Sequence, residues 1–332
     1  MPLTMAAIIG GVLVATHHTK IPALTLPVSS PIPSPGSAKS VGSAQVAMAD
    51  ACLGAIPENF TGIAVKKQIP IIVPQFQKNT STPVKVVEVY NPFPGSKFNA
   101  AEADQAIRLG ALPLIQLNPR TVTMAQIASG AEDRYIKSYA LAVKKFRCDV
   151  VLSLGHEMNG WWYHWGLPWT QPATFIAAWR HVHGIFATAG ATNVIWSWDP
   201  SHQYDQVAPG KVASPASEWY PGNAYVDWVG VDGYLGQDRN GDLQNFGEIF
   251  SHQLASIESV AKNKLIYVAE TGVAPGRFDV KQIAYLFAGL RQYKLHGVIW
   301  FEVDVTKKND WRLGNRPVAA KAYGAEARSY TR

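Results

Sequence analysis

Short apolar runs alternate with longer amphipathic stretches from about residue 50 to the end of the chain. The apolar runs are rich in Val, Ile and Leu and have the length of buried strands. Eight runs are candidate strands: 51–55, 84–90, 112–117, 149–155, 193–198, 226–232, 265–270 and 297–303. Strands that alternate with helical stretches form parallel sheets covered by helices. The pattern therefore predicts an α/β fold built from eight βα units.

Two of the intervening stretches have a clear helical period. In 279–293, apolar side chains recur every three or four positions, and Asp279 is placed to cap the first turn. In 131–147, a similar stripe includes Tyr139 and Phe146. We interpret both stripes as core packing, with no direct part in function.

Eight βα units over roughly 280 residues are typical of a closed (β/α)₈ TIM barrel. An open, doubly wound sheet is the alternative. The phosphate-binding signatures of such sheets, G-x-G-x-x-G or a Walker loop, do not follow the first candidate strand. We therefore expect one TIM-barrel domain that spans residues 49–332.

The N-terminal segment has a different composition from the rest of the chain. Residues 1–20 include the apolar stretch 5–15, which has signal-peptide length and is too short to be assigned as a membrane span. Residues 21–48 are rich in Pro, Ser and Gly, as in extended, disordered linkers. We expect a hydrophobic leader (a signal peptide or weak anchor), a tether, and a folded domain that is extracellular or tethered to the cell envelope.

The bulk composition excludes several classes of protein. A hydrophobic content of 47% and a mean hydropathy of −0.03 describe a soluble globular chain rather than a membrane bundle. The net charge is +6, but Lys and Arg are scattered, so no stripe for binding nucleic acid is indicated. We expect a monomer with no nucleic-acid partner. Eleven Trp and thirteen Tyr, by contrast, supply flat rings that can stack on sugars.

The chain has two cysteines, Cys52 and Cys148, and each lies at the start of a candidate strand. Because free cysteines are commonly buried in apolar surroundings, we expect two buried free thiols. A disulfide is the alternative for an exported protein, although a lone pair of cysteines does not by itself indicate one.

The segment after the fourth candidate strand carries the densest chemistry in the chain. The polar sequence His-Glu-Met-Asn occupies residues 156–159, directly after the apolar run. Four tryptophans follow within nine residues: Trp161, Trp162, Trp165 and Trp169. Desolvation among indole rings disfavours the charged form of Glu157 and keeps a proton on it near neutral pH. A protonated carboxyl beside rings that stack on sugars predicts an acid catalyst that cleaves carbohydrate.

A second carboxylate is expected opposite the first. In a TIM barrel, functional side chains lie at the C-terminal ends of the strands. Strands four and seven face one another across the barrel mouth, so Glu157 and Glu270 form a natural pair. Retaining glycosidases need two carboxyl groups about 5–5.5 Å apart, one an acid/base and the other a nucleophile. Asp199 and Asp232 also end strands, and we expect them to shape the mouth by hydrogen bonding.

The sequences GHEMNGWWYHWG, VDWVGVDGY, IYVAETG and IWFEVD…DWRL resemble those of glycoside hydrolase family 26, a (β/α)₈ family of retaining enzymes. The resemblance runs from about Cys52 to Arg312, nearly the whole folded region. It implies that Glu157 is the general acid/base and Glu270 the nucleophile.

The same resemblance implies roles for neighbouring side chains. His156 would form a hydrogen bond at the cleavage subsite, Tyr234 would hold the nucleophile, and Trp162 would line the site. The remaining expected substrate contacts are Trp165, Asn159 and Trp300, the last as the floor of the site.

Two metal-binding motifs are considered and set aside. His156 and Glu157 begin an H-E-x-x-H pattern, but Gly160 occupies the second histidine position. Residues 238–242 resemble a calcium loop, but the glycine is misplaced and Glu248 falls one residue short of the twelfth position. We interpret that segment as a solvated turn and expect no metal and no cofactor.

The resemblance leaves the polysaccharide open, because family members act mainly on β-1,4-mannan, and others on mixed-linkage β-glucan or β-1,3-xylan. Mannan-cleaving members usually carry histidines after strands two and three, where this chain has 90–92 and 116–119. Ser153 and Phe301 stand where some members have arginine. We expect an endo-β-1,4-mannanase on family frequency, with a mixed-linkage β-1,3-1,4-glucanase or β-xylanase as the alternative. A non-catalytic sugar-binding barrel would be expected to lack one glutamate.

Overall fold

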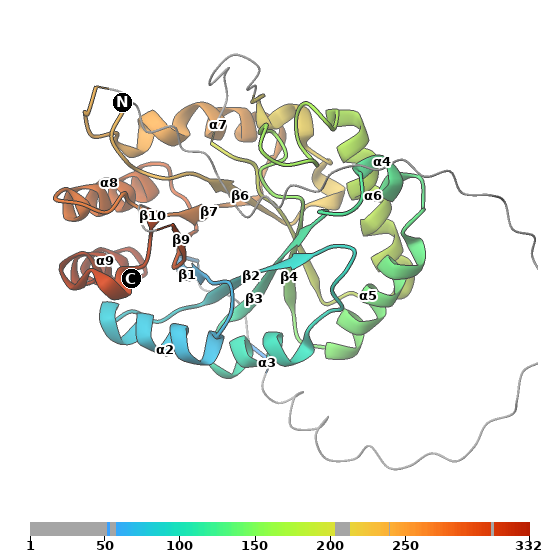
Figure 1. Ribbon diagram of the computed structural model, residues 1–332, viewed down its shortest axis with the longest axis horizontal. Coiled ribbons are helices and arrows are strands. Elements are labelled where there is room, and N and C mark those ends of the chain that lie inside the picture. Colours follow the sequence, from blue (N-terminus) through green and yellow to red (C-terminus); the bar gives the residue numbers. More distant parts are fainter. Residues whose placement is uncertain (1–51, 54–57, 203–212, 239, 307–308) are drawn as a thin grey trace, which may run out of the picture.

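Eight parallel strands close into a barrel that is surrounded by helices (Figure 1). The computed structural model describes residues 52–53, 58–202, 213–238, 240–306 and 309–332. The strands are β1 (Phe60–Ala64), β2 (Val86–Pro92), β3 (Leu112–Asn118), β4 (Val150–Leu154), β5 (Val194–Trp198), β6 (Trp228–Asp232), β7 (Leu265–Thr271) and β8 (Gly297–Phe301). Strand β1 pairs with both β2 and β8, which closes the barrel. The predicted (β/α)₈ barrel is confirmed, and the open sheet is excluded.

Helices cover the outside of the barrel and connect most successive strands. Between β5 and β6, the described residues form two short 3-10 helices in place of an α-helix. The α-helices are α2 (Ile69–Thr80), α3 (Ala100–Arg108), α4 (Met124–Ala128), α5 (Asp133–Phe146), α6 (Pro172–Ala189), α7 (Phe246–Val260), α8 (Asp279–Gln292) and α9 (Pro317–Tyr330). Short elements lie in the connections: η1 (Ala216–Trp219), η2 (Asn223–Tyr225), η3 (Leu313–Asn315), β9 (Asp304–Thr306) and β10 (Asn309–Asp310). Within the described ranges, no helix has both the length and the apolar character needed to cross a bilayer.

The predicted helical stripes are found with small shifts in their boundaries. In α5, Tyr139, Val143 and Phe146 are buried, as the period predicts. Helix α8 begins at Asp279, so this residue is not the N-cap that the sequence suggested. Its carboxylate instead accepts a hydrogen bond from the Gly276 N–H at 2.6 Å and pairs with Arg316 at 3.0 Å.

The first strand is not where the sequence predicted it. Cys52 and Leu53 of the predicted segment 51–55 are not in a strand, and the rest of that segment lies outside the described residues. Strand β1 is Phe60–Ala64, which pairs with β2 and β8. It is buried throughout because its side chains face the inside of the barrel or the layer beneath the helices. Gly62 allows close contact with β2, since a Cβ there would lie 2.7 Å from the Val86 carbonyl oxygen.

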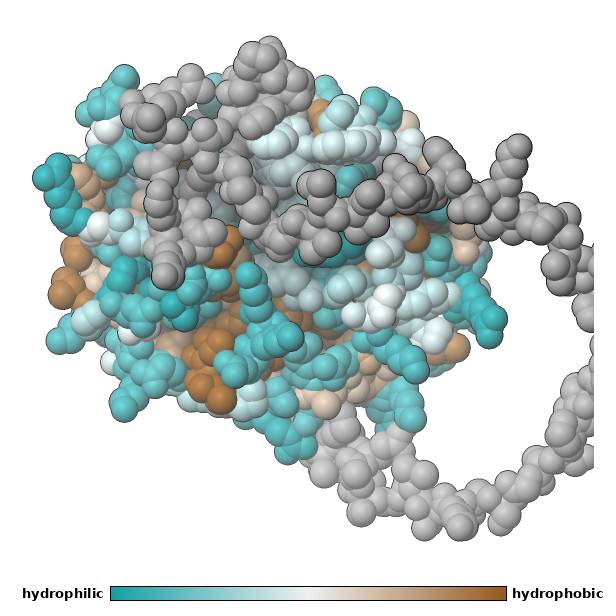
Figure 2. All heavy atoms as spheres, in the orientation of Figure 1, coloured by the Kyte–Doolittle hydropathy of each residue, from teal (hydrophilic) through white to brown (hydrophobic). Residues whose placement is uncertain are grey.

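The core has two layers, one inside the barrel and one between the barrel and its helices. The inner layer includes Phe60, Leu114, Val151, Tyr267 and Ile299. The outer layer is larger and includes most of the buried tryptophans. Alternate residues of each strand face the two layers, as the two-residue period of a strand requires. On the face that Figure 2 shows, hydrophobic side chains gather in a few groups among hydrophilic ones.

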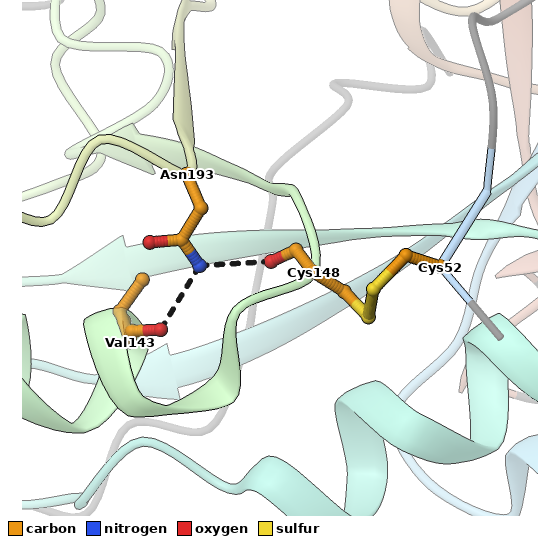
Figure 3. Close-up of a disulfide and its surroundings, with 4 residues drawn as sticks. All are labelled: Cys52, Val143, Cys148 and Asn193. Carbon is orange, nitrogen blue, oxygen red and sulfur yellow. Dashed lines mark hydrogen bonds between the residues drawn. A yellow bond between two sulfur atoms is a disulfide. The ribbon is translucent and has the colours of Figure 1, made fainter. Parts of the chain in front are cut away.

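A disulfide joins Cys52 to Cys148, with the two Cα atoms 5.2 Å apart (Figure 3). The prediction of two buried free thiols is therefore wrong, and Cys52 is exposed rather than buried. The Asn193 side-chain amide donates to the carbonyl oxygens of Cys148 and Val143, at 2.8 and 2.9 Å, and so fixes the chain on one side of the bridge (Figure 3). The bridge links the segment before β1 to the start of β4. The predicted leader (1–20) and linker (21–48) lie outside the described residues.

Reduction of this disulfide should destabilise the barrel. The bridge spans 96 residues, and cross-links of this length stabilise proteins by about 2–4 kcal/mol, largely by restricting the unfolded chain. We expect dithiothreitol to lower the Tm by about 5–10 °C and the Cys52→Ser/Cys148→Ser variant to melt at the same lowered temperature with or without it. Two titratable thiols in the denatured, unreduced protein would contradict the bridge, as would a Tm unaffected by reduction.

Candidate active site

Glu157 lies in the loop that follows β4, in an uncommon backbone conformation. Its φ angle is +53°, in the left-handed region that non-glycine residues rarely occupy. Two backbone hydrogen bonds hold it there. The Glu157 N–H donates to the Asp199 carbonyl oxygen at 2.7 Å, and the Gly160 N–H donates to the Glu157 carbonyl oxygen at 3.0 Å. A strained residue that is fixed in this way is typical of functional sites.

The Trp162 indole lies next to the Glu157 carboxyl group. Its Nε1–H donates to Glu157 Oε2 at 2.6 Å. Gly160 makes this approach possible, because a Cβ at that position would lie 2.3 Å from the Trp162 ring. Of the other tryptophans in this loop, Trp169 is 58% exposed and Trp165 is buried.

Burial and the neighbouring carboxylate of Glu270 raise the pKa of Glu157 to about 8, and the hydrogen bond from Trp162 opposes this shift. The charge of Glu270 is the second cause of this shift, after burial, so the carboxyl groups after β4 and on β7 influence one another electrostatically. A carboxyl group with this pKa holds its proton at neutral pH and can act as an acid.

Glu270 faces the barrel mouth because of an irregularity in β7. The pairing register shifts between Val268 and Thr271 on the side of β8, and again beside Asp232 on β6. Ala269 belongs to the inner core layer, yet the next side chain also reaches groups inside the barrel. Strand irregularities often reorient a side chain at a functional site in this way.

Two phenol groups bind the Glu270 carboxylate, one on each oxygen. Tyr234 donates to Oε1 and Tyr90 donates to Oε2. Burial raises the pKa of Glu270, whereas these two hydrogen bonds and the positive charge of Lys66 lower it. Glu270 accepts two hydrogen bonds from side chains and Glu157 accepts one, from Trp162. The net result is a raised pKa for Glu270. The two phenol donors oppose this rise and favour the anion of Glu270 over that of Glu157.

His156 is buried beside the two glutamates and is uncharged. Burial, assisted by the positive charge of Arg120, lowers its pKa to about 3. Its Nδ1 lies 3.1 Å from the Asn118 side-chain oxygen, which can only accept a hydrogen bond. Nδ1 therefore carries the proton, and Nε2 is an acceptor that can receive a hydrogen bond from a hydroxyl group.

Two residues that were expected to contact substrate support the loop from beneath. Trp165 is 3% exposed, donates through Nε1 to the His156 carbonyl oxygen at 2.7 Å, and stacks on Tyr163. Asn159 is fully buried and binds the backbone of Ser201 and Ser214, with hydrogen bonds of 2.8–3.1 Å. These contacts join the β4 loop to the β5 loop, and they correct the expectation that Trp165 and Asn159 bind sugar.

Trp300 does not form the floor of the site. It is fully buried in the outer core layer, donates to the Trp311 carbonyl oxygen at 2.9 Å and packs against Tyr323 of α9. The next residue, Phe301, belongs to the inner layer. The expectation for Trp300 is wrong because adjacent residues of a strand face opposite sides, and Phe301 is the one on the side of the site.

A layer of buried polar groups lies inside the barrel below the glutamates. The Gln116 amide donates to Glu88 at 2.9 Å and to Asp199 at 3.0 Å. Ser197 also donates to Asp199, at 2.6 Å. Gly230 makes room for this carboxylate, since a Cβ there would lie 2.3 Å from Asp199 Oδ1. The expectation that Asp199 acts through hydrogen bonds agrees with these contacts.

Asp232 differs from Asp199. It is fully buried, and neither side-chain oxygen has a hydrogen-bond partner within the described part of the chain. Burial and the charge of Glu270 raise its pKa.

The segment 238–242, which resembles a calcium loop, was expected to be a solvated turn. In it Asp238 accepts the backbone N–H groups of Asn240 and Asp242 at 2.8 and 2.9 Å. That carboxylate closes its own turn, as we interpreted the segment.

Residues 126–322 match the model of glycosyl hydrolase family 26. The chain belongs to this family. It is also 31% identical to endoglucanase H of Acetivibrio thermocellus over 231 residues, which are 67% of this chain and 25% of that protein. It is 34% identical to mannan endo-1,4-beta-mannosidase A and B of Caldalkalibacillus mannanilyticus over 86 residues, which are 24% of this chain and 15% of that protein. The chain thus spans a quarter or less of the length of these two relatives.

A solved family 26 structure shares the fold. The beta-mannanase BoMan26A of Bacteroides ovatus superimposes with a TM-score of 0.60 and 16% sequence identity, over 86% of this chain and 91% of that one. At this identity the likeness concerns the barrel alone.

The sequence did not identify two residues of this family 26 site. Tyr90 binds Glu270 and Asn118 binds His156. Both lie at the C-terminal ends of strands, β2 and β3. That position is the signal by which they could have been found, because it is where a TIM barrel places its functional side chains.

The stability of the protein should depend on pH through Glu157. Its folded pKa of about 8 lies above the ordinary value of 4.5, so between these pH values the unfolded chain has lost a proton that the folded chain retains. Unfolding then releases a proton, and stability falls as pH rises. We expect Glu157→Gln to raise the Tm by a few degrees more at pH 8 than at pH 5.

Calorimetry at the two pH values measures this difference. Glu258→Gln, the same change at an exposed position on α7, is the control and should give equal Tm differences at both pH values. An equally pH-independent effect of Glu157→Gln would contradict the raised pKa.

Proposed function

We propose that the protein is a retaining β-glycoside hydrolase that cleaves a polysaccharide by double displacement, with Glu157 as acid/base and Glu270 as nucleophile. The observation that supports this most strongly is the contrast between the two carboxyl groups. The pKa of Glu157 is raised to about 8, whereas Glu270 accepts hydrogen bonds from Tyr90 and Tyr234, which lower its pKa and favour its anion. One side chain is therefore prepared to give a proton and the other to attack.

In the first step, Glu270 attacks the anomeric carbon while Glu157 protonates the departing glycosidic oxygen. The result is a glycosyl ester on Glu270. Because the charge of Glu270 is one of the causes that raise the pKa of Glu157, formation of the ester removes that cause. Glu157 then becomes a stronger acid and is left as a carboxylate. It can accept a proton from the water that releases the sugar and restores Glu270.

The neighbouring groups have the properties that this reaction needs. Neutral His156 presents an acceptor for a sugar hydroxyl, and Tyr234 holds the nucleophile in place. Trp162 is half-buried beside Glu157, so its ring can line the site while its N–H orients the acid. A non-catalytic sugar-binding barrel would not need two glutamates in such different environments.

For the substrate we propose β-1,4-mannan, because several relatives are named as mannan endo-1,4-beta-mannosidases. A β-glucan is the second candidate. The relative named endoglucanase H matches over 231 residues, whereas the match to the Caldalkalibacillus mannanase covers 86. We further propose that the enzyme acts outside the cell or at its envelope, since disulfides such as Cys52–Cys148 persist in oxidising compartments.

Removal of the nucleophile should abolish turnover and leave the fold intact. We expect Glu270→Ala to lower kcat by about 10⁴-fold or more, with an unchanged circular dichroism spectrum. Azide, a small anion that fits the vacated space, should restore cleavage of an activated aryl glycoside and give a glycosyl azide of the opposite anomeric configuration. Glu258→Ala, on the exposed side of α7, serves as the control. Wild-type activity in Glu270→Ala would refute the assignment.

The substrate and the stereochemistry can be measured together. We expect reducing ends to be released from β-mannan, or from mixed-linkage β-glucan if the second candidate is right, and proton NMR to show the β-anomer as the first product. An α-anomer formed first would contradict double displacement. Absence of cleavage across a panel of mannans, glucans and xylans would contradict the proposed function.

A further inference from the structure

The two tyrosines that bind Glu270 come from different sides of the barrel. Tyr234 follows β6, and Tyr90 lies on β2 next to Gln116 of β3 in the strand register. The sequence resemblance gave a role to Tyr234 alone. Tyr90 donates a hydrogen bond to the other carboxylate oxygen, so both oxygens of Glu270 are held by phenol groups.

Phe301 fixes the relative position of the two phenol rings. The Tyr90 ring meets it edge-on, with centroids 6.4 Å apart and an interplanar angle of 89°. The Tyr234 ring meets it at 6.0 Å and 81°. Tyr90, Phe301 and Tyr234 form what we call the tyrosine clamp. His156 supports its open side, 5.8 Å from the Tyr90 ring.

Tyr90 remains a hydrogen-bond donor over the whole pH range of a working enzyme. Burial raises the pKa of its phenol, as do the charges of Glu270 and Glu88. Deprotonation would place a second negative charge beside Glu270, which the buried site disfavours. The phenol therefore serves as a fixed neutral dipole directed at Oε2.

The two phenols lie in different surroundings. The charge of Glu157 contributes to the raised pKa of Tyr234, and that of Glu88, inside the barrel, contributes to the raised pKa of Tyr90. In the proposed reaction the anomeric carbon lies between Glu157 and Glu270. Tyr234 donates to Oε1 and Tyr90 donates to Oε2, so each phenol binds one of the two oxygens that can attack this carbon.

We propose that Tyr90 is a positioning residue that holds Oε2 of the Glu270 carboxylate, and that it chiefly assists release of the sugar. This inference rests on the proposed function. When one oxygen of Glu270 bonds to the anomeric carbon, the other becomes the carbonyl oxygen of the ester. When water breaks that bond, negative charge returns to the carboxylate, and Tyr90 stabilises the share that develops on Oε2.

The kinetic test is Tyr90→Phe on a 2,4-dinitrophenyl β-glycoside of the disaccharide unit that the wild type cleaves. Because the leaving group is good, hydrolysis of the glycosyl-enzyme limits kcat. We expect kcat to fall about 10–100-fold, with a parallel fall in KM as the intermediate accumulates, and therefore a much smaller change in kcat/KM. A pre-steady-state burst of dinitrophenol should appear.

The pH profile gives a second readout. Loss of one donor to Glu270 should raise its pKa, so the acid limb of kcat/KM should move to higher pH by roughly half a unit or more. Tyr135→Phe is the matched control. It removes a phenol that donates to the Ser96 carbonyl oxygen, remote from the carboxylates, and should leave kcat, KM and the profile unchanged. A fall in kcat/KM that is equal at all pH values, without a fall in KM, would overturn the proposal.

A measurement without turnover separates this proposal from the proposed function. Carbon-13 NMR of glutamate-labelled protein, with Glu270 assigned by loss of its signal in Glu270→Gln, reports its pKa directly. A higher pKa in Tyr90→Phe and an unchanged one in Tyr135→Phe support the clamp even if no polysaccharide is cleaved. An identical Glu270 pKa in Tyr90→Phe and wild type would overturn it even in an active hydrolase.

Discussion

The site depends on the unequal stabilisation of two carboxyl groups that influence one another electrostatically, the buried Glu270 and the half-buried Glu157. Neighbouring carboxylates in a poorly solvated site do not readily ionise together, so the surrounding donors decide which one keeps the proton. Here Tyr90 and Tyr234 both donate to Glu270, whereas Glu157 receives the Trp162 indole N–H. Every step that we propose for the reaction follows from this asymmetry, and it reverses when Glu270 loses its charge.

The part of the protein that holds these groups in place contains several energetically unfavourable features. Glu157 occupies the left-handed region of backbone space, and the carboxyl groups of Glu88, Asp199 and Asp232 are fully buried below the mouth. The barrel accommodates them through glycines that admit large neighbours, at Gly160 and Gly230, and through amides that bind two partners, at Gln116. Side chains expected to touch sugar, such as Trp165 and Asn159, hold the loops of this part of the protein together.

The periodic features of the chain could be predicted from sequence. Seven of the eight strands lie at or near their predicted positions, and the fold follows from their alternation with helices. The misplaced first strand had a competitor, 51–55, of similar apolar character, and only pairing with β2 and β8 distinguishes Phe60–Ala64. The disulfide was missed because two cysteines distant in sequence carry no sign of their proximity.

The glutamates could be placed because their position at strand ends is a property of the fold. The direction of each neighbouring side chain could not be predicted. It depends on which residues of a strand face the inside of the barrel, and a shift of one residue reverses this. Trp300 and Phe301 exchange sides if the register moves by one residue, and the irregular pairing of β7 is what aims Glu270 inward. Tyr90 was overlooked for a similar reason, because β2 and β7 are distant in sequence and only closure of the barrel through β8 and β1 brings them near one another.

The most direct test of the account is to trap the covalent intermediate. A 2-deoxy-2-fluoro β-glycoside with a dinitrophenyl leaving group should inactivate the enzyme, and peptide mass spectrometry should find one added sugar on the side chain of Glu270. Attachment of the sugar to another residue would contradict the assignment of the nucleophile. Intact, unlabelled protein that still releases dinitrophenol would contradict double displacement itself.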